Sequence, residues 1–356
     1  MSAEPQALPP ETVEPRRSAG FARLMSWDTS IIVLTAIFLV VASLSIEHFG
    51  TTRNFGFLVL DLAPILLLAL PLTLIIATGE IDLSVASMTG LASAAMGVLW
   101  TSGLPLETIM PLVVLIGAVL GALNGFFVTV LGLPALAVTI GTLALYRGLA
   151  YVLLGDTAVA DWPRDFTGWA IGTMGETFVP NILIPLIVLS ALFGIVLHAT
   201  PLGRSIFAMG ANATAAAFSG IHVERTKFWL YVLSGAVAGL VGVYWTLRYS
   251  SARADNAHGL ELTVVAAVLF GGVSIFGGKG TLPGVIAGVL LLASIQNALR
   301  LGGVATETLT VVTGGLLIIS VLLPNILTAV RTAAERRRRA RALRRQPGST
   351  PEPEPR

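Results

Sequence analysis

Long apolar runs, one after another, are the feature that most restricts how this chain can fold. An α-helix crosses the hydrocarbon of a bilayer with about 20 mostly apolar residues, since only internal hydrogen bonds satisfy its backbone there. The runs cover residues 31–46, 57–78, 83–100, 110–131, 134–154, 182–198, 228–247, 262–275, 284–299 and 308–330. The sequence therefore predicts an all-α polytopic membrane protein with about ten transmembrane helices, within a range of roughly eight to eleven. The runs 262–275 and 284–299 fit two broken helices or one re-entrant excursion, because they flank the glycine-rich stretch GGVSIFGGKGTLPG (271–284).

The charge distribution agrees with a bilayer location and divides the chain into three parts. Only 12% of the residues are charged, against about 25% in soluble proteins. Residues 31–330 hold ten basic and thirteen acidic side chains, whereas residues 331–356 hold nine arginines and three acids. We expect a disordered cytoplasmic N-terminal tail (1–30), a transmembrane permease domain (31–330) and a basic, then disordered, cytoplasmic C-terminal tail (331–356).

Basic residues also predict the direction of the spans. With the N-terminus in the cytoplasm, sixteen Lys and Arg residues fall inside and five fall outside, as the positive-inside rule requires. The run ERRRRARALRR (335–345) directly follows the last apolar run. We interpret it as an anchor on anionic membrane lipid, and we expect no nucleic-acid partner.

The two halves of the chain share a sequence pattern that indicates a possible internal repeat. TGEIDLSVASMTG (78–90) precedes LNGFFVTVLGLPALAVTIGTLAL (123–145), and FGGVSIFGGKGTLPG (270–284) precedes QNALRLGGVATETLTVVTGGLLI (296–318). An offset of 173 residues places Asn124 on Asn297, and an offset of 192 aligns the earlier glycine clusters. Related halves that meet around a substrate path are a recurring plan of transporters.

Charged residues inside the apolar region are the first candidates for function, because each costs at least about 2.5–3.5 kcal/mol to insert. The break at 79–84 holds Glu80 and Asp82. It fits two interpretations: Asp82 or Ser84 caps the next helix, or the acids line a polar path with Asn124. For Arg147 and the preceding tyrosine we expect a snorkelling position at the membrane interface.

Several kinds of chemistry are excluded. The chain has no cysteine, and its four histidines show no metal-ligand spacing, so we expect no metal site, cofactor or catalytic residue. No phosphate-binding P-loop or serine elbow is present. The chain is not expected to be an enzyme, and active transport would need a separate ATPase subunit or an ion gradient.

The loop at 200–227 is longer than a connection between adjacent helices requires. It contains many small residues, with Gly210 and Gly220 near the ends of an alanine-rich segment. Small side chains allow another protein to approach closely. We therefore expect this loop to dock a partner.

Four stretches, in order, resemble the permease subunits of bacterial monosaccharide ABC importers of the ribose, xylose, rhamnose and autoinducer-2 type. They are GEIDLSVAS (79–87), LNGFFVTVLGLPALAVTIGTLALYRGLA (123–150), GRSIFAMGANATAAAFSGIHVERTK (203–227) and ARADNAHGLELTVVAAVLFGGVSIFGGKGTLPG (252–284). The rhamnose and autoinducer-2 permeases are the most similar. Glu80 departs from the family pattern, in which a second glycine stands at this position.

The resemblance implies a cobalamin-importer-like ABC membrane domain in the bacterial inner membrane that imports a monosaccharide by alternating access. The implied partners are a cytoplasmic ATP-binding subunit, a periplasmic sugar-binding protein and a second permease chain, in a homodimer or heterodimer. Neutral sugars favour a path of uncharged polar groups. The candidate path residues are Asp82, Asn124, Thr139, Thr142 and Asn297. The residues expected to couple the chain to the ATPase are Gly210, Asn212, Ala215, Ser219 and Gly220.

Two alternatives stay open. A gradient-driven secondary transporter of a small polar solute could use Glu80 and Asp82 as proton or cation ligands. A branched-chain amino-acid ABC permease is the nearest alternative within the same transport class.

Overall fold

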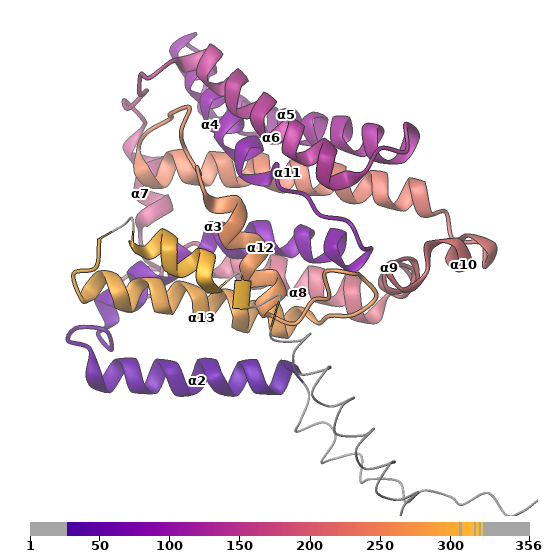
Figure 1. Ribbon diagram of the computed structural model, residues 1–356. Helices are drawn as coiled ribbons and strands as arrows, with labels where there is room; N and C mark the ends of the chain where they lie inside the picture. Colours follow the sequence, from indigo (N-terminus) through magenta and orange to yellow (C-terminus); the bar gives the residue numbers. More distant parts are fainter. Residues whose placement is uncertain (1–26, 306–307, 317, 320–321, 323–356) are drawn as a thin grey trace, which may run out of the picture.

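The computed structural model describes residues 27–305, 308–316, 318–319 and 322, and within these residues the chain is helical (Figure 1). β-Pairing in the described residues is limited to two isolated bridges. The α-helices are α2 (Trp27–Ser45), α3 (Thr52–Ala77), α4 (Val85–Thr101), α5 (Leu106–Gly125), α6 (Ala135–Leu154), α7 (Arg164–Ile171), α8 (Leu183–Ala199), α9 (Pro201–Ala211), α10 (Ala213–Phe218), α11 (Val223–Tyr249), α12 (Leu260–Phe270) and α13 (Leu282–Leu301). A π-helix, η1 (Phe126–Val130), extends α5. The predicted all-α class is confirmed, while nearly all of the two predicted tails lies outside the described residues.

Among the described residues, fewer helices are long enough to span a membrane than the sequence predicts. Six helices of the described part are long and apolar enough to cross a membrane, or seven if α8 and α9, which meet at 66°, form one bent span. The six are α2, α3, α5 with η1, α6, α11 and α13. The predicted count of about ten is not confirmed, because α4 and α12 adjoin the breaks at 78–84 and 271–281 and are too short, and because much of the predicted run 308–330 lies outside the described residues. With 11 residues, α12 extends only about 16 Å.

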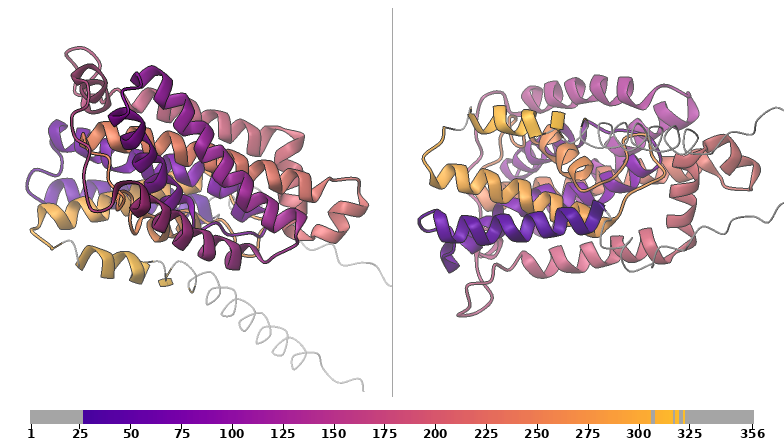
Figure 2. Two further views of the ribbon diagram at one scale, coloured as in Figure 1. Left: turned by 90° about the horizontal axis from the view of Figure 1, so that it is seen from above. Right: turned by 60° about the horizontal axis from the view of Figure 1, so that its bottom comes forward.

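Burial separates an inner helix from peripheral ones. In α3 the apolar window is 94% buried, whereas the corresponding shares are 17% in α2 and 22% in α6. An apolar helix with an exposed face fits contact with lipid. In Figures 1 and 2, α2 lies alongside α13, and the Thr35 hydroxyl of α2 donates to the carbonyl of Ala287 at 3.2 Å. We therefore place α3 in the core of the helix bundle and α2 at the periphery of the bundle.

A glycine seam brings α5 and α11 into close contact. The glycines recur every fourth residue, at Gly117 and Gly121 in α5 and at Gly235 and Gly239 in α11. A Cβ atom at Gly117 would lie 2.9 Å from the Cα of Gly239, and one at Gly121 would lie 3.0 Å from the Cα of Gly235. Such spacing lets two helix backbones touch in a membrane, where packing has to replace the hydrophobic effect between helices.

The bundle has two differently built ends, which we name by a helix at each. The α10 end carries α9, α10 and the loop 271–281, at the right of Figure 1. The α7 end carries α7 and the loops 46–51, 102–105, 155–163 and 250–259. At the α7 end the backbones of Val159 and Ala252 pair, and the rings of Trp100 and Trp162 stack at 5.5 Å.

Candidate functional site

A buried polar cluster forms where the first break meets α5 and α6. The Oδ1 atom of Asp82 accepts hydrogen bonds from the backbone N–H of Ser84 at 2.9 Å and from its hydroxyl at 2.6 Å. The Asn124 amide donates to the Ser84 oxygen at 2.7 Å. The Tyr146 hydroxyl lies 3.1 Å from Asn124 Oδ1. Asp82 therefore holds the backbone just before α4, whose N-cap residue Ser84 makes no side-chain capping bond. Asp82 is also part of a polar network with Asn124, and the role of this network in a path stays a prediction.

The predicted threonines extend this cluster. The Thr139 hydroxyl donates to the carbonyl of Ile81 at 3.3 Å, and Thr142 donates to the carbonyl of Thr139 at 3.4 Å. Both threonines are buried. The structure thus brings four of the five candidate path residues into one connected region.

Asn297 lies elsewhere. It exchanges two hydrogen bonds with Asn54, at 2.9 and 3.1 Å, and both amides are buried. Asn54 also donates to the carbonyl of Phe49, toward the α7 end. The sequence echo that aligned Asn297 with Asn124 therefore does not place the two residues in one site.

The polar cluster is closed to solvent and has unused hydrogen-bonding capacity. Asp82, Ser84 and Asn124 are fully buried. Asp82 Oδ2 has no hydrogen-bond partner among the described residues, and the same holds for the hydroxyls of Tyr231 and Ser234 on α11. A buried polar group without a partner is costly. A water or a solute hydroxyl would reduce this cost.

Glu80, which stands where the resemblance leads us to expect a glycine, forms an ion pair with Lys227, the fifth residue of α11. The two side chains are only 22% and 15% exposed. Lys227 lies nine residues after the end of α10 in the sequence. The extra acid is thus neutralised by a residue that the sequence placed in a separate loop.

The predicted coupling residues fall into two groups. Asn212 caps α10, with its Oδ1 accepting from Ala215 N–H at 2.9 Å, and the Ser219 hydroxyl donates to the carbonyl of Ala215 at 3.0 Å. These residues and Gly220 are exposed. Phe218, which the sequence reasoning missed, is 90% exposed. The sequence signal that could have identified Phe218 is a large apolar side chain next to a run of alanines.

Gly210 forms the second group, because it packs against backbone atoms from other segments of the same chain. A Cβ atom there would overlap the carbonyl oxygen of Ala77 and the amide of Gly278. Gly278 donates its N–H to the same carbonyl at 2.9 Å. A Cβ at Gly277 would lie 2.7 Å from the nitrogen of Gly79 and 2.9 Å from the Cα of Gly210. We call these contacts of residues 77–79, 210 and 277–278 the backbone junction.

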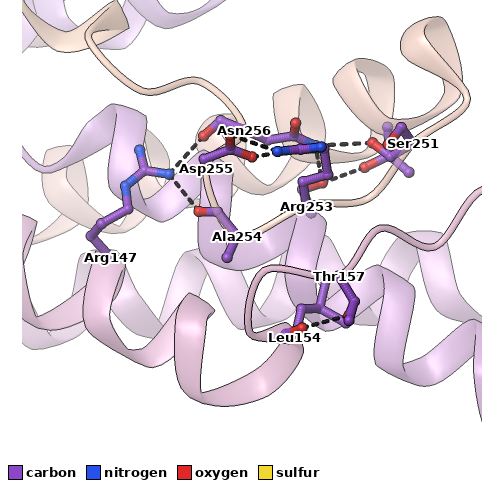
Figure 3. A network of polar contacts seen from close by, with 10 residues as sticks. Arg147, Leu154, Thr157, Ser251, Arg253, Ala254, Asp255 and Asn256 are labelled. Carbon is purple, nitrogen blue, oxygen red and sulfur yellow. Dashed lines mark hydrogen bonds and ion pairs between the residues drawn. The ribbon is translucent and has the colours of Figure 1, made fainter.

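Arg147 has a different position from the one predicted. Its Nη1 atom donates to the carbonyls of Ala254 at 2.7 Å and Asn256 at 2.8 Å (Figure 3). The interpretation of a snorkelling arginine was wrong, because the guanidinium is part-buried and bonds to backbone carbonyls of the loop 250–259. In that loop Arg253 pairs with Asp255 at 2.7 Å, and this hydrogen bond lowers the pKa of the Asp255 carboxyl.

The described residues contain no group of three or more His, Asp or Glu side chains that could hold a metal ion. The remaining charge in an apolar run, Asp61, forms ion pairs with Arg248 of α11 and Arg300 of α13. The charged groups in the described interior are therefore paired with one another or bonded to backbone.

Comparison with known proteins identifies close relatives along most of the chain. The autoinducer 2 import system permease protein LsrD of Yersinia enterocolitica is 31% identical over 306 residues, which are 84% of this chain and 92% of that protein. LsrD of Yersinia pseudotuberculosis, serotype O:1b, is 30% identical, with 84% and 91% covered. These matches confirm the predicted resemblance to bacterial import permeases.

One solved structure, described as an inward-facing metal-chelate type ABC transporter, aligns with a TM-score of 0.47 and 14% identity over 85% of this chain and 99% of that chain. This similarity is too low to decide the cobalamin-importer class, which stays a prediction. The family model for the permease component of the branched-chain amino acid transport system matches residues 54–321. That match covers most of the chain, which therefore belongs to this family of transport permeases.

Proposed function

We propose that the chain is the membrane-spanning subunit of an ATP-binding-cassette importer for a neutral monosaccharide of the rhamnose or autoinducer-2 type. The observation that carries this proposal is the 31% identity to an autoinducer 2 import permease over 84% of the chain. The importer would work in the bacterial inner membrane, with both termini of this chain in the cytoplasm. Its other parts would be a cytoplasmic ATP-binding subunit, a periplasmic sugar-binding protein and a second permease chain.

The buried cluster supports a neutral, hydroxyl-rich solute. Asn124, Thr139 and Thr142 offer uncharged donors and acceptors, and Asp82 contributes one free carboxylate oxygen. A sugar hydroxyl can donate to that oxygen and accept from an amide or hydroxyl at the same time. In an outward- or inward-open state the cluster would line the path, and in the present closed arrangement its members bond to one another.

The α10 end supports coupling to an ATPase. Asn212, Ala215, Ser219, Gly220 and Phe218 present one exposed surface on α10 and its flanks. Gly210, two residues before Asn212 in the chain, touches the end of α3 through the backbone junction. Movement of α10 by closing ATPase domains would therefore reach Ala77 and, five residues later, Asp82. This is a rigid-body relay between packed elements.

Reconstitution tests the proposal. The chain would be placed in proteoliposomes with the ATPase, the binding protein and the second permease of the same importer. We expect ATP-dependent uptake of a labelled monosaccharide from a panel that includes rhamnose, ribose and autoinducer-2. Uptake without ATPase under a proton or sodium gradient would contradict the proposal and select the secondary transporter.

Branched-chain amino acids are the second candidate substrates, because the family model carries their name. The same assay with labelled leucine, isoleucine and valine separates the two. Inhibition of amino-acid uptake, but not of sugar uptake, by excess unlabelled leucine would favour this candidate. We expect the reverse pattern, with unlabelled sugar as the effective competitor.

A further inference from the structure

A second polar site lies far from the buried cluster, at the α7 end of α3, α11 and α13. It is a cavity of about 140 Å³ lined by Asp61, Trp245, Arg248, Tyr249, Gln296 and Arg300, among others. Sixteen residues separate Asp61 from Ala77, which is about 24 Å along α3.

The charged side chains form the base and the rim of this cavity. Asp61 bonds Arg248 through one carboxylate oxygen and Arg300 Nη1, at 3.1 Å, through the other. Arg248 also donates to the carbonyl of Leu60 at 2.6 Å. The Arg248 side chain is 9% exposed and that of Arg300 is 48% exposed. The cavity thus leads from a buried base to an open rim.

Aromatic rings form one wall. The rings of Trp245 and Tyr249 lie 5.2 Å apart, and the Arg248 guanidinium lies 4.7 Å from the centre of the Tyr249 ring. The described residues provide no hydrogen-bond partner for the indole N–H or for the Tyr249 hydroxyl. Gln296 uses its Nε2 atom to donate to Thr313 at 3.0 Å, so its carbonyl oxygen remains an available acceptor.

This combination matches a neutral polyhydroxy compound better than an anion. Guanidinium groups only donate, whereas a carboxylate and an amide oxygen accept, and a sugar hydroxyl does both. A phosphate or carboxylate ligand could use the arginines but would meet the negative charge of Asp61 beside them. The apolar C–H face of a sugar can lie against an aromatic wall.

We propose that this cavity is a monosaccharide-binding subsite at the end of the chain opposite the α10 surface. The inference rests on the proposed function, because it assigns this subsite to the same imported sugar. The sugar would contact the rim first and would replace water between Trp245, Gln296 and the paired arginines. The subsite differs from the predicted path residues, of which it contains none.

Ligand binding to the full-length chain in lipid nanodiscs gives the first test. Tryptophan fluorescence would be followed during titration with rhamnose, with ribose and with inorganic phosphate. We expect a saturable change with a sugar, lost in Trp245→Phe and kept in the matched variant Trp169→Phe on α7. No saturable change with either sugar, a response to phosphate alone, or equal loss in both variants would overturn the inference.

Transport by the reconstituted importer gives the second test and separates the two proposals. We expect Gln296→Ala and Trp245→Phe to raise the KM for sugar uptake at least fivefold. If the wild-type importer moves sugar and both variants keep its KM, the subsite is wrong and the proposed function stands. If the wild type moves no sugar while the nanodisc titration still depends on Trp245, the proposed function fails and the subsite stands.

Discussion

At its α10 end and at its α7 end, α3 is held to its neighbours by opposite means. At the α10 end, glycine and alanine backbone atoms meet directly in the backbone junction, and a Cβ on Gly210 has no room. At the α7 end, long side chains make the contacts: Asp61 bridges Arg248 and Arg300 in the lining of a cavity. Backbone contacts have almost no freedom to rearrange, whereas ion-paired side chains can change partners. The first construction suits the transmission of movement, and the second suits the reception of a solute.

We expect the largest effect from Asp61→Leu, which removes the carboxylate that links Arg248 and Arg300. This change leaves two guanidinium groups without their carboxylate, and loss of one partner of a buried ion pair costs about 3–5 kcal/mol. We expect a clear fall in the thermal unfolding midpoint of the detergent-solubilised chain. The control is Asp156→Leu, an exposed acid at the same end. Equal midpoints for the two variants would show that the α7 end does not depend on this network.

The next effect comes from the backbone construction. Gly210→Val forces a side chain into the carbonyl of Ala77, and overpacking of this kind costs about 2–3 kcal/mol. We expect lower stability and loss of ATP-driven uptake together. Gly148→Val is the matched control, because a Cβ at this position of α6 meets nothing within 4 Å. A Gly210→Val chain of wild-type stability would contradict the junction, and this variant therefore cannot test ATPase docking by itself.

A smaller effect is expected at Glu80 and Lys227, the one ion pair that the structure shows beside the backbone junction. A double-mutant cycle with Glu80→Gln and Lys227→Gln should give a coupling of about 1 kcal/mol. The exchanged pair, Glu80→Lys with Lys227→Glu, should recover part of the lost stability. Additive effects of the two single changes would mean that the ion pair contributes nothing.

The smallest effect is expected in loop 250–259 and depends on pH. Pairing with Arg253 lowers the pKa of Asp255, so the carboxylate stabilises the loop above its ordinary pKa. This stabilisation is lost as the pH falls through the lowered pKa. The protection factors of the loop amides, which correct for the slower intrinsic exchange at low pH, should fall at low pH in the wild type and change less in Asp255→Asn. The same pH response in both would exclude Asp255 as the cause.

The sequence predicted those parts of the structure that depend on local pattern. Apolar runs gave the positions of the long helices, and the break at 79–84 was expected to contain a capping residue and polar neighbours. Asp82 and Asn124 meet through Ser84, whereas their role in a path stays a prediction. Short helices such as α12 were counted as spans because hydropathy does not show where a helix ends.

Long-range pairing could not be read from the chain. Nothing near Asp61 indicates that its partners are Arg248 and Arg300, which are 187 and 239 residues away. Gly210 was predicted to lie on a docking surface because small residues permit the approach of another protein. The residue is small because the chain's own α3 approaches it. A pattern of small residues shows that something comes close, and only the structure shows what.

The ion pair between Glu80 and Lys227 has a consequence for how these two positions evolve. A chain with glycine at position 80 has no acid to neutralise, so a basic residue at 227 is then unnecessary. A chain that gains the acid first carries an unmatched charge in a mostly buried place until the second substitution arrives. The two positions, 147 residues apart, should therefore change together among relatives, and their joint identity should mark the lineage that acquired this variant of the break.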